Sequence, residues 1–233
     1  MPAPLVRFSV VLAFAGCACG GPPAANDLVL GAGERLLAKD PSALADNAVF
    51  VDAEGPTPDA GVALVAAAFD DIGALDAHHD VLRARLGTGQ FLFALVNEVG
   101  LVSLAAILPV PGEGIPDDDG AVAHYQAAWN ESAPSLRRDL LEQSWATDGR
   151  FVDPSSDVDG RADLLEHIAT TRSQTPGSSF ASVGGVQERG PVLTFAWRME
   201  VLGLGVLDGV DVGVLDDDDH LGLIAGFWGA LPR

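Results

Sequence analysis

Two aspartates in the second half of the chain lie in very different surroundings. Asp153 lies in RFVDPSSDVDGRADLLEHI, residues 150–168, between a short apolar run and Pro154, just ahead of a segment with helical apolar spacing. It is either an ordinary turn residue or a carboxylate directed into a cavity that the following helix helps to close. Asp211 lies among the valines of residues 210–214, where burial of a charged carboxylate is costly. Two carboxyls in unlike surroundings suit acid–base chemistry, in which one is ionised and the other stays neutral.

Other polar residues are weaker candidates. His124 and His167 lie within helical segments, and we interpret both as ordinary helix residues. The acidic run 216–219 before His220 lacks the alternating ligands and the glycine of a calcium loop, so a solvated hairpin is expected. Arg198 either pairs with one of the two aspartates or points to solvent. No nucleophile elbow, P-loop or dinucleotide glycine pattern is present, and we predict neither a metal nor a cofactor.

The spacing of apolar residues predicts the elements that position these aspartates. Helical spacing occurs within residues 122–129, 136–141 and 164–168. After Thr175-Pro176-Gly177 the pattern changes to the two-residue period of strands, over residues 193–199, 206–215 and 221–228. Helices followed by a strand meander predict an α+β fold, in which a curved antiparallel sheet closes on the helices.

The first half of the chain repeats part of this pattern. Phe50-Val51-Asp52 recurs as Phe151-Val152-Asp153 with similar surroundings, which indicates a duplicated unit. Residues 78–86, 90–96 and 101–109 read as three strands where the second half has four, so the first unit is shortened. It keeps Asp52 but has no matching acid on its last strand, residues 101–107. We expect a structural role, with its sheet packed against the second half.

The order of elements, together with Trp129, Phe151-Val152-Asp153-Pro154 and Gly226-Phe227-Trp228-Gly229, resembles the SnoaL-like branch of the nuclear transport factor two-like superfamily. The resemblance covers residues 120–229 well and residues 28–109 poorly. It implies tandem cone-shaped units, each with helices followed by a curved antiparallel sheet. Members range from isomerases, cyclases and epoxide hydrolases to non-catalytic binders, so the fold alone fixes no activity. We expect the second pocket to be lined by Tyr125, Trp129, Phe151, Trp197 and Phe227.

Within this superfamily, Phe151-Val152-Asp153-Pro154 matches the segment that carries the general base of ketosteroid isomerase. Residues 207–212 are similar to the strand that carries its protonated oxyanion-hole aspartate. The resemblance implies that Asp153 is the base and Asp211 the hydrogen-bond donor. A helical tyrosine completes that oxyanion hole, but by spacing its place is taken here by Trp129, which is more simply a core residue. Tyr125, one turn earlier, would substitute only if the helix shifted.

Two functions follow from these observations. The first is a pocket that binds a small hydrophobic ligand or a partner without catalysis. The alternative is a ketosteroid-isomerase-like or cyclase-like enzyme that acts on a carbonyl compound. The chain has 33 acidic and 13 basic residues and a net charge of −20, which argues against nucleic acid as a partner. A homodimer, or packing between the two halves, is expected.

The N-terminus has the order of a secretory signal. Arg7 precedes an uncharged apolar run, residues 8–18, which is too short to span a bilayer. Phe14-Ala15-Gly16-Cys17 resembles a lipobox, which predicts a signal peptide over residues 1–16, lipidation at Cys17 and a tether over residues 17–27. A plain signal peptide cut near Ala18 is the alternative. Export across the inner membrane and a lipid anchor at the cell envelope are therefore expected, followed by units 28–109 and 121–233 and a linker over 110–120.

Overall fold

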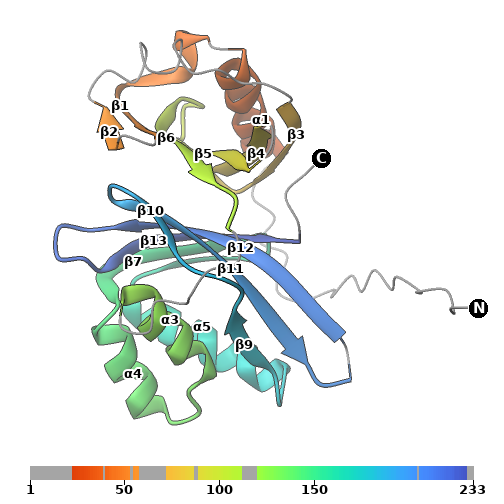
Figure 1. The fold of residues 1–233 in the computed structure, drawn as a ribbon, viewed down its shortest axis with the longest axis vertical. Coiled ribbons are helices and arrows are strands. Elements are labelled where there is room, and N and C mark those ends of the chain that lie inside the picture. Colours follow the sequence, from red (N-terminus) through yellow and green to blue (C-terminus); the bar gives the residue numbers. More distant parts are fainter. Residues whose placement is uncertain are drawn as a thin grey trace, which may run out of the picture.

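A computed structural model describes residues 23–38, 40–52, 55–57, 72–86, 89–111, 120–203 and 205–229. Two units follow one another, each with helices against one face of a curved sheet (Figure 1). The predicted tandem α+β architecture is confirmed; over residues 72–109 the first unit has four strands, where the sequence predicted three. The predicted signal peptide, Cys17 and most of the predicted linker lie outside the described residues.

In the part of the N-terminal unit that the structure describes, one long helix and a short 3₁₀ helix accompany a six-stranded sheet. Its strand order is β2-β1-β6-β5-β4-β3, with β1 parallel to β6 and all other neighbours antiparallel. The sequence predicted one strand over residues 78–86, but the structure has two: β3 ends at His78, residues 79–80 form a turn, and β4 begins at Val81. The helix begins inside the segment assigned to the tether. The elements are α1 (Pro23–Leu37), η1 (Pro41–Ala43), β1 (Leu44–Asp52), β2 (Gly55–Thr57), β3 (Ile72–His78), β4 (Val81–Leu86), β5 (Gln90–Val96) and β6 (Val102–Pro109).

Helix α1 packs on the inner face of this sheet. Val29, Ala32 and Leu36 recur at helical spacing and form one buried cluster with the sheet residues Leu82 and Leu92. This face of the N-terminal sheet is therefore filled by core packing.

The C-terminal unit contains three helices and a seven-stranded sheet. The strand order is β10-β11-β12-β13-β7-β8, and β9 pairs with β11. One pair, β7 with β13, is parallel, whereas the others are antiparallel. The elements are α3 (Ala121–Asn130), α4 (Pro134–Glu142), β7 (Trp145–Asp153), β8 (Ser156–Asp159), α5 (Arg161–Gln174), β9 (Ser179–Ser182), β10 (Gln187–Arg189), β11 (Val192–Val201), β12 (Gly205–Leu215) and β13 (Leu221–Trp228).

The repeated Phe-Val-Asp segments occupy the same place in the two sheets. Phe50-Val51-Asp52 ends β1, and Phe151-Val152-Asp153 ends β7. In both, the valine is the last residue in parallel register with the final strand of its unit, opposite Ala106 in one sheet and Ala225 in the other. The aspartate then starts the turn into a short antiparallel strand. The sequence repeat therefore corresponds to a repeat in strand position.

The outer faces of the two sheets pack against each other, and helices α3, α4 and α5 lie on the opposite side of the C-terminal sheet (Figure 1). At the edge of this interface Arg150 Nη1 donates to Asp80 Oδ2 at 2.6 Å, and its other nitrogens donate to Asp157. The interface core consists mainly of Val51, Val81, Phe91, Phe93, Ala106, Leu108, Val152, Val192, Val210, Val212, Leu223, Ala225 and Phe227.

Among the described helices, none has the length and hydropathy to cross a membrane.

Candidate functional site

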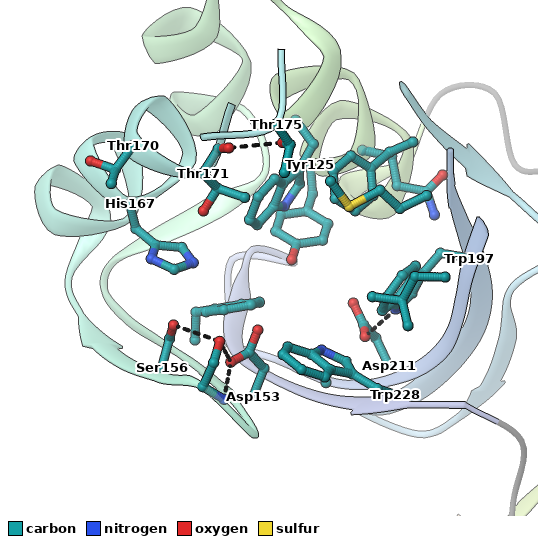
Figure 2. A pocket seen from close by; sticks show the side chains of 18 of the residues that line it. Tyr125, Asp153, Ser156, His167, Thr170, Thr171, Thr175, Trp197, Asp211 and Trp228 are labelled. Atoms are coloured by element: carbon teal, nitrogen blue, oxygen red, sulfur yellow. Dashed lines mark hydrogen bonds between the residues drawn. The ribbon is translucent and has the colours of Figure 1, made fainter. Parts of the chain in front are cut away.

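The C-terminal unit encloses a cavity of about 520 Å³ between the inner face of its sheet and its helices (Figure 2). This volume lies within the range of small-molecule binding sites. Polar side chains from α5 and from the turn after β7 form part of its wall. The apolar and aromatic part of the wall comes from Tyr125, Trp129, Phe151, Phe180, Phe195, Trp197, Met199, Leu207 and Trp228.

Asp153 lies at the end of β7 and faces this cavity. Pro154 favours an extended backbone at Asp153, and Asp153 Oδ1 accepts hydrogen bonds from the Ser155 N–H at 2.8 Å and the Ser155 hydroxyl at 2.9 Å. Figure 2 shows the other carboxylate oxygen directed into the cavity. Burial raises the pKa of Asp153, although the Ser155 bonds oppose that shift. Asp153 thus holds the turn with one oxygen and presents the other to the cavity.

Asp211 lies on β12 and is only 5% exposed. The Trp197 indole Nε1–H donates to Asp211 Oδ1 at 2.6 Å. Burial raises the pKa of Asp211 to about 8; the indole bond opposes this shift, and the charge of Asp153 adds to it. Asp211 is therefore protonated at neutral pH, and its second oxygen is directed into the cavity (Figure 2).

Gly226 brings the two aspartates together. It is opposite Asp211 in the β12–β13 register and follows Ala225, the last residue of β13 in register with β7. A Cβ atom at position 226 would lie 3.2 Å from Asp211 Oδ1 and 3.3 Å from Asp153 Cβ. Both carboxyls therefore border the same glycine from neighbouring strands.

Tyr125, on α3, supplies a third polar group. Its ring stacks on Trp145 with centroids 5.5 Å apart, and Figure 2 shows its hydroxyl pointing into the cavity. Burial raises the pKa of Tyr125 well above its usual value, so the hydroxyl stays protonated. The charges of Asp211 and Asp153 add to this shift, and a side-chain hydrogen bond with Trp129 opposes it.

By spacing, Trp129 takes the tyrosine position of the oxyanion hole, and the sequence favours it as a core residue. In the structure Trp129 is buried in the core cluster and also lines the cavity. The Trp129 ring packs against Phe151 and Phe180, with centroids 5.9 and 4.9 Å away, and Tyr125 presents the hydroxyl. The rotation of α3 about its axis decides which of the two aromatics reaches the acid pair.

His167 also belongs to the site, which the sequence interpretation missed. It lines the cavity from α5, and its ring lies 5.3 Å from the Phe151 ring. Burial lowers the pKa of His167, and the charge of Asp153 partly offsets this shift. Its position three residues after the buried Leu164 and one before the buried Ile168 was the available signal.

Phe227 was predicted to line the pocket, and this prediction is wrong. Consecutive strand residues point to opposite faces, so Phe227 lies in the interface between the two sheets and Trp228 lines the cavity instead. Arg198 pairs with neither site aspartate; its Nε donates to the exposed Asp208 at 2.7 Å. The other predicted lining residues, Tyr125, Trp129, Phe151 and Trp197, do face the cavity.

The acidic segment between β12 and β13 forms a turn. Asp216 Oδ1 accepts from the backbone N–H groups of Asp218 and His220. No group of three or more metal-ligating side chains is found among the described residues.

Comparison with known proteins places the chain in a family. A candidate isomerase of the SnoaL-like family from Agrobacterium tumefaciens strain C58 is 32% identical, with 47% of this chain matching 95% of that chain at a TM-score of 0.45. The chain belongs to the SnoaL-like family. The matched share of this SnoaL-like chain is about that of one of its two units.

Two further solved structures are similar to this SnoaL-like protein at lower identity. A candidate SnoaL-like polyketide cyclase from Jannaschia sp. CCS1 is 15% identical, with 46% of this chain matching 84% of that chain at a TM-score of 0.37. A nuclear transport factor two-like protein of unknown function from Exiguobacterium sp. 255-15 is 14% identical, with 47% of this chain matching 98% of that chain at a TM-score of 0.40. No family model and no curated protein matches the chain.

Proposed function

We propose that this SnoaL-like protein is an isomerase-type or cyclase-type enzyme that moves a proton at the carbon beside a carbonyl group of a small hydrophobic molecule. One observation carries the proposal: Asp153 and Asp211 border one glycine in one cavity, and burial raises the pKa of Asp211 to about 8. Separated or solvent-facing carboxyls would have argued against catalysis.

The proposed mechanism assigns one task to each group. Ionised Asp153 takes the proton from the carbon, and the electrons move onto the carbonyl oxygen. Protonated Asp211 and the Tyr125 hydroxyl then donate hydrogen bonds to that oxygen, where charge develops. The apolar cavity wall strengthens both bonds because it excludes water.

His167 offers a second proton-transfer group on the wall formed by α5. Because burial keeps it neutral near pH 7, one ring nitrogen can accept a proton while the other donates. In a double-bond shift or a ring closure, His167 would deliver the proton to an atom other than the one that lost it. The aromatic wall and the uncharged donors favour a neutral, hydrophobic carbonyl compound as substrate.

Binding without catalysis is the second candidate. Its specific support is the pair of hydrogen bonds from Ser155 to Asp153 Oδ1, which would be present in a purely structural turn. In that case Asp153 stabilises the turn and the cavity holds a ligand or a partner segment.

A panel of unsaturated ketones, assayed with the native protein and with Asp153→Asn, separates the two candidates. The proposal expects turnover that falls by roughly 10²–10⁴-fold in the variant, while ligand affinity stays similar. Asp159→Asn, on the exposed side of the same hairpin, is the matched control and should retain activity. No turnover by the native protein, together with a lower melting temperature of Asp153→Asn, would support binding alone.

We also propose that Cys17 is lipidated and anchors the protein at the cell envelope after export across the inner membrane. The support is the Phe14-Ala15-Gly16-Cys17 segment and the apolar run before it. Cys17→Ser should move the protein from the membrane fraction to the soluble fraction, because the acyl chains supply the membrane affinity. Unchanged membrane association would refute the anchor.

The N-terminal unit is, in this proposal, a degenerate copy of the C-terminal one. Shared strand order and the common register of the two Phe-Val-Asp segments support it. The proposed organisation is a signal over 1–16, a tether from Cys17 to the start of α1 at Pro23, an N-terminal unit that extends to residue 109, a linker over 110–120 and a C-terminal unit over 121–233.

A further inference from the structure

Two residues of the N-terminal unit contact the strand that carries the site. His78 Nε2 lies 2.8 Å from the Gly226 carbonyl oxygen, and Arg83 Nη2 donates to the Trp228 carbonyl oxygen at 3.2 Å. Both contacts cross the interface between the two sheets, and both fall on the last residues of β13.

This end of β13 lies between Asp153 and Asp211 and determines their separation. The register between β13 and β7 ends at Ala225 opposite Val152, so Gly226 lies beyond the last β7 pairing. Gly226 lies between Asp153 and Asp211, and a Cβ at this position would make tight contacts of 3.2 and 3.3 Å with them. A change in the position of Gly226 therefore changes the distance between the two carboxyls.

The contacts from the N-terminal unit are buried and well packed. Arg83 is 1% exposed, its Cζ lies 4.7 Å from the centroid of the Phe227 ring, and its guanidinium pairs with Asp76 at 2.8 Å. The His78 ring lies 4.8 Å from the Phe227 ring. His78 and Arg83 therefore both pack against the Phe227 ring, and they contact the backbone carbonyls of the residues on either side of it, Gly226 and Trp228.

We propose that His78 and Arg83 are positioning residues of the C-terminal site, which hold residues 226–228 of β13 from behind and thereby fix the separation of Asp153 and Asp211. The N-terminal unit then completes a site, although none of its described residues lines the cavity. This inference concerns the site of the proposed function, but its test requires no substrate.

Electrostatics supports the same assignment. Burial lowers the pKa of His78 to about 4, so its ring is neutral and Nε2–H donates to the Gly226 carbonyl. The Arg83 charge lowers the pKa of Asp211 and so opposes burial and the charge of Asp153, which both raise it. Around Asp211, the other groups that matter are Trp197, which donates to it, and Tyr125, whose hydroxyl faces it.

Nuclear magnetic resonance of the full chain tests the proposal through two signals. The first is the titration of Asp211, followed with ¹³C-carboxyl-labelled aspartate and assigned by its loss in Asp211→Asn. The second is the indole proton resonance of Trp197, which reports its hydrogen bond to Asp211. Arg83→Met should shift the Asp211 midpoint upward, because a nearby positive charge is lost.

His78 provides a rescue pair. His78→Leu removes the donor to Gly226, so the Trp197 indole resonance should shift and broaden. His78→Gln should restore it, because a glutamine amide N–H can occupy the place of Nε2–H. Asp80→Asn weakens the other inter-unit bridge, to Arg150, without touching β13, and should leave both signals unchanged.

Unchanged signals in folded Arg83→Met and His78→Leu, even with lower melting temperatures, would overturn the proposal and leave a purely structural role. If Arg83→Met does not fold, the His78 pair decides alone: equal spectra for the two variants would overturn it. Altered signals with no ketone turnover would retain this inference and refute the proposed function.

Discussion

The two units have the same strand order and register but use the inner faces of their sheets differently. In the C-terminal unit Asp211 lies opposite Gly226; in the N-terminal unit the corresponding pair is Leu92 opposite Ile107. By the same register, Leu86 takes the place of Trp197. Leu86 and Leu92 belong to the cluster that α1 covers. Substitution at three positions thus replaces an acid-lined site with a closed core.

This difference shows how stability and function are divided along the chain. An open cavity and a buried carboxyl both cost stability. The N-terminal unit has neither a cavity nor a buried carboxyl at these positions. Its sheet covers the outer face of the C-terminal sheet, which carries both. In our proposal, the N-terminal unit, which has Leu92 at the position of Asp211, supports the site from behind.

The sharpest way to break this comparison is to return the acid to the N-terminal unit. Leu92→Asp places a carboxyl at a fully buried position among apolar side chains. Because no indole lies opposite to donate a hydrogen bond, we expect a loss of about 4 kcal/mol or more in the free energy of unfolding. Urea unfolding measures it. A loss below about 1 kcal/mol would show that the N-terminal core tolerates the acid and that the comparison is wrong.

The support given by the N-terminal sheet is tested next. Phe93 is fully buried in the interface and lies edge-to-face with Phe227, at 6.3 Å. Phe93→Ala should cost about 3–5 kcal/mol and remove packing behind β13. Leu202→Ala, at an exposed hairpin position, is the control and should change stability little. Equal denaturation midpoints for the two variants would contradict a packed interface.

The smallest expected effect comes from neutralising the C-terminal acid. Asp211→Asn should raise the free energy of unfolding at pH 7 by about 1–3 kcal/mol, because the amide oxygen still accepts from Trp197 and no carboxyl must be kept neutral. The folded pKa, about 8, lies above the value of 3.8 expected when unfolded. The contribution of Asp211 to the free energy of unfolding is therefore fully present below about pH 3.8, and it is lost as the pH rises to about 8.

The advantage of Asp211→Asn should therefore grow across this interval and level off above it. Melting temperatures of both proteins from pH 4 to 9 measure it. A constant difference across that range would mean that Asp211 titrates normally in the folded protein.

Much of the C-terminal unit could be predicted from the sequence, because its periodic apolar residues mark helices and strands directly. Asp153 was identified because it ends a short apolar run before a proline, and Asp211 because it interrupts a run of valines. Side-chain direction was harder to predict. A two-residue period shows that Phe227 and Trp228 lie on opposite faces but does not say which face has the cavity, and both faces of this sheet are buried.

The remaining errors have related causes. Tyr125 and Trp129 share a helix face, so only the packing of α3 decides which reaches the acids. The counterpart of Asp211 was sought on the last strand of the N-terminal unit, whereas register places it at Leu92 on β5. His78 and Arg83 had no sequence signal at all, because their role depends on contact between two sheets that are distant in the chain.

The central claim is that one cavity holds an ionised and a protonated aspartate at neutral pH. Titration of the two carboxyls in the native protein by ¹³C nuclear magnetic resonance tests it most directly, with Asp153→Asn and Asp211→Asn to assign the signals. We expect a midpoint of about 8 for Asp211 and a lower midpoint for Asp153 that is still raised above the ordinary aspartate value. If both carboxyls titrate together near the ordinary value of about 3.9, both are ionised at neutral pH and the account is wrong.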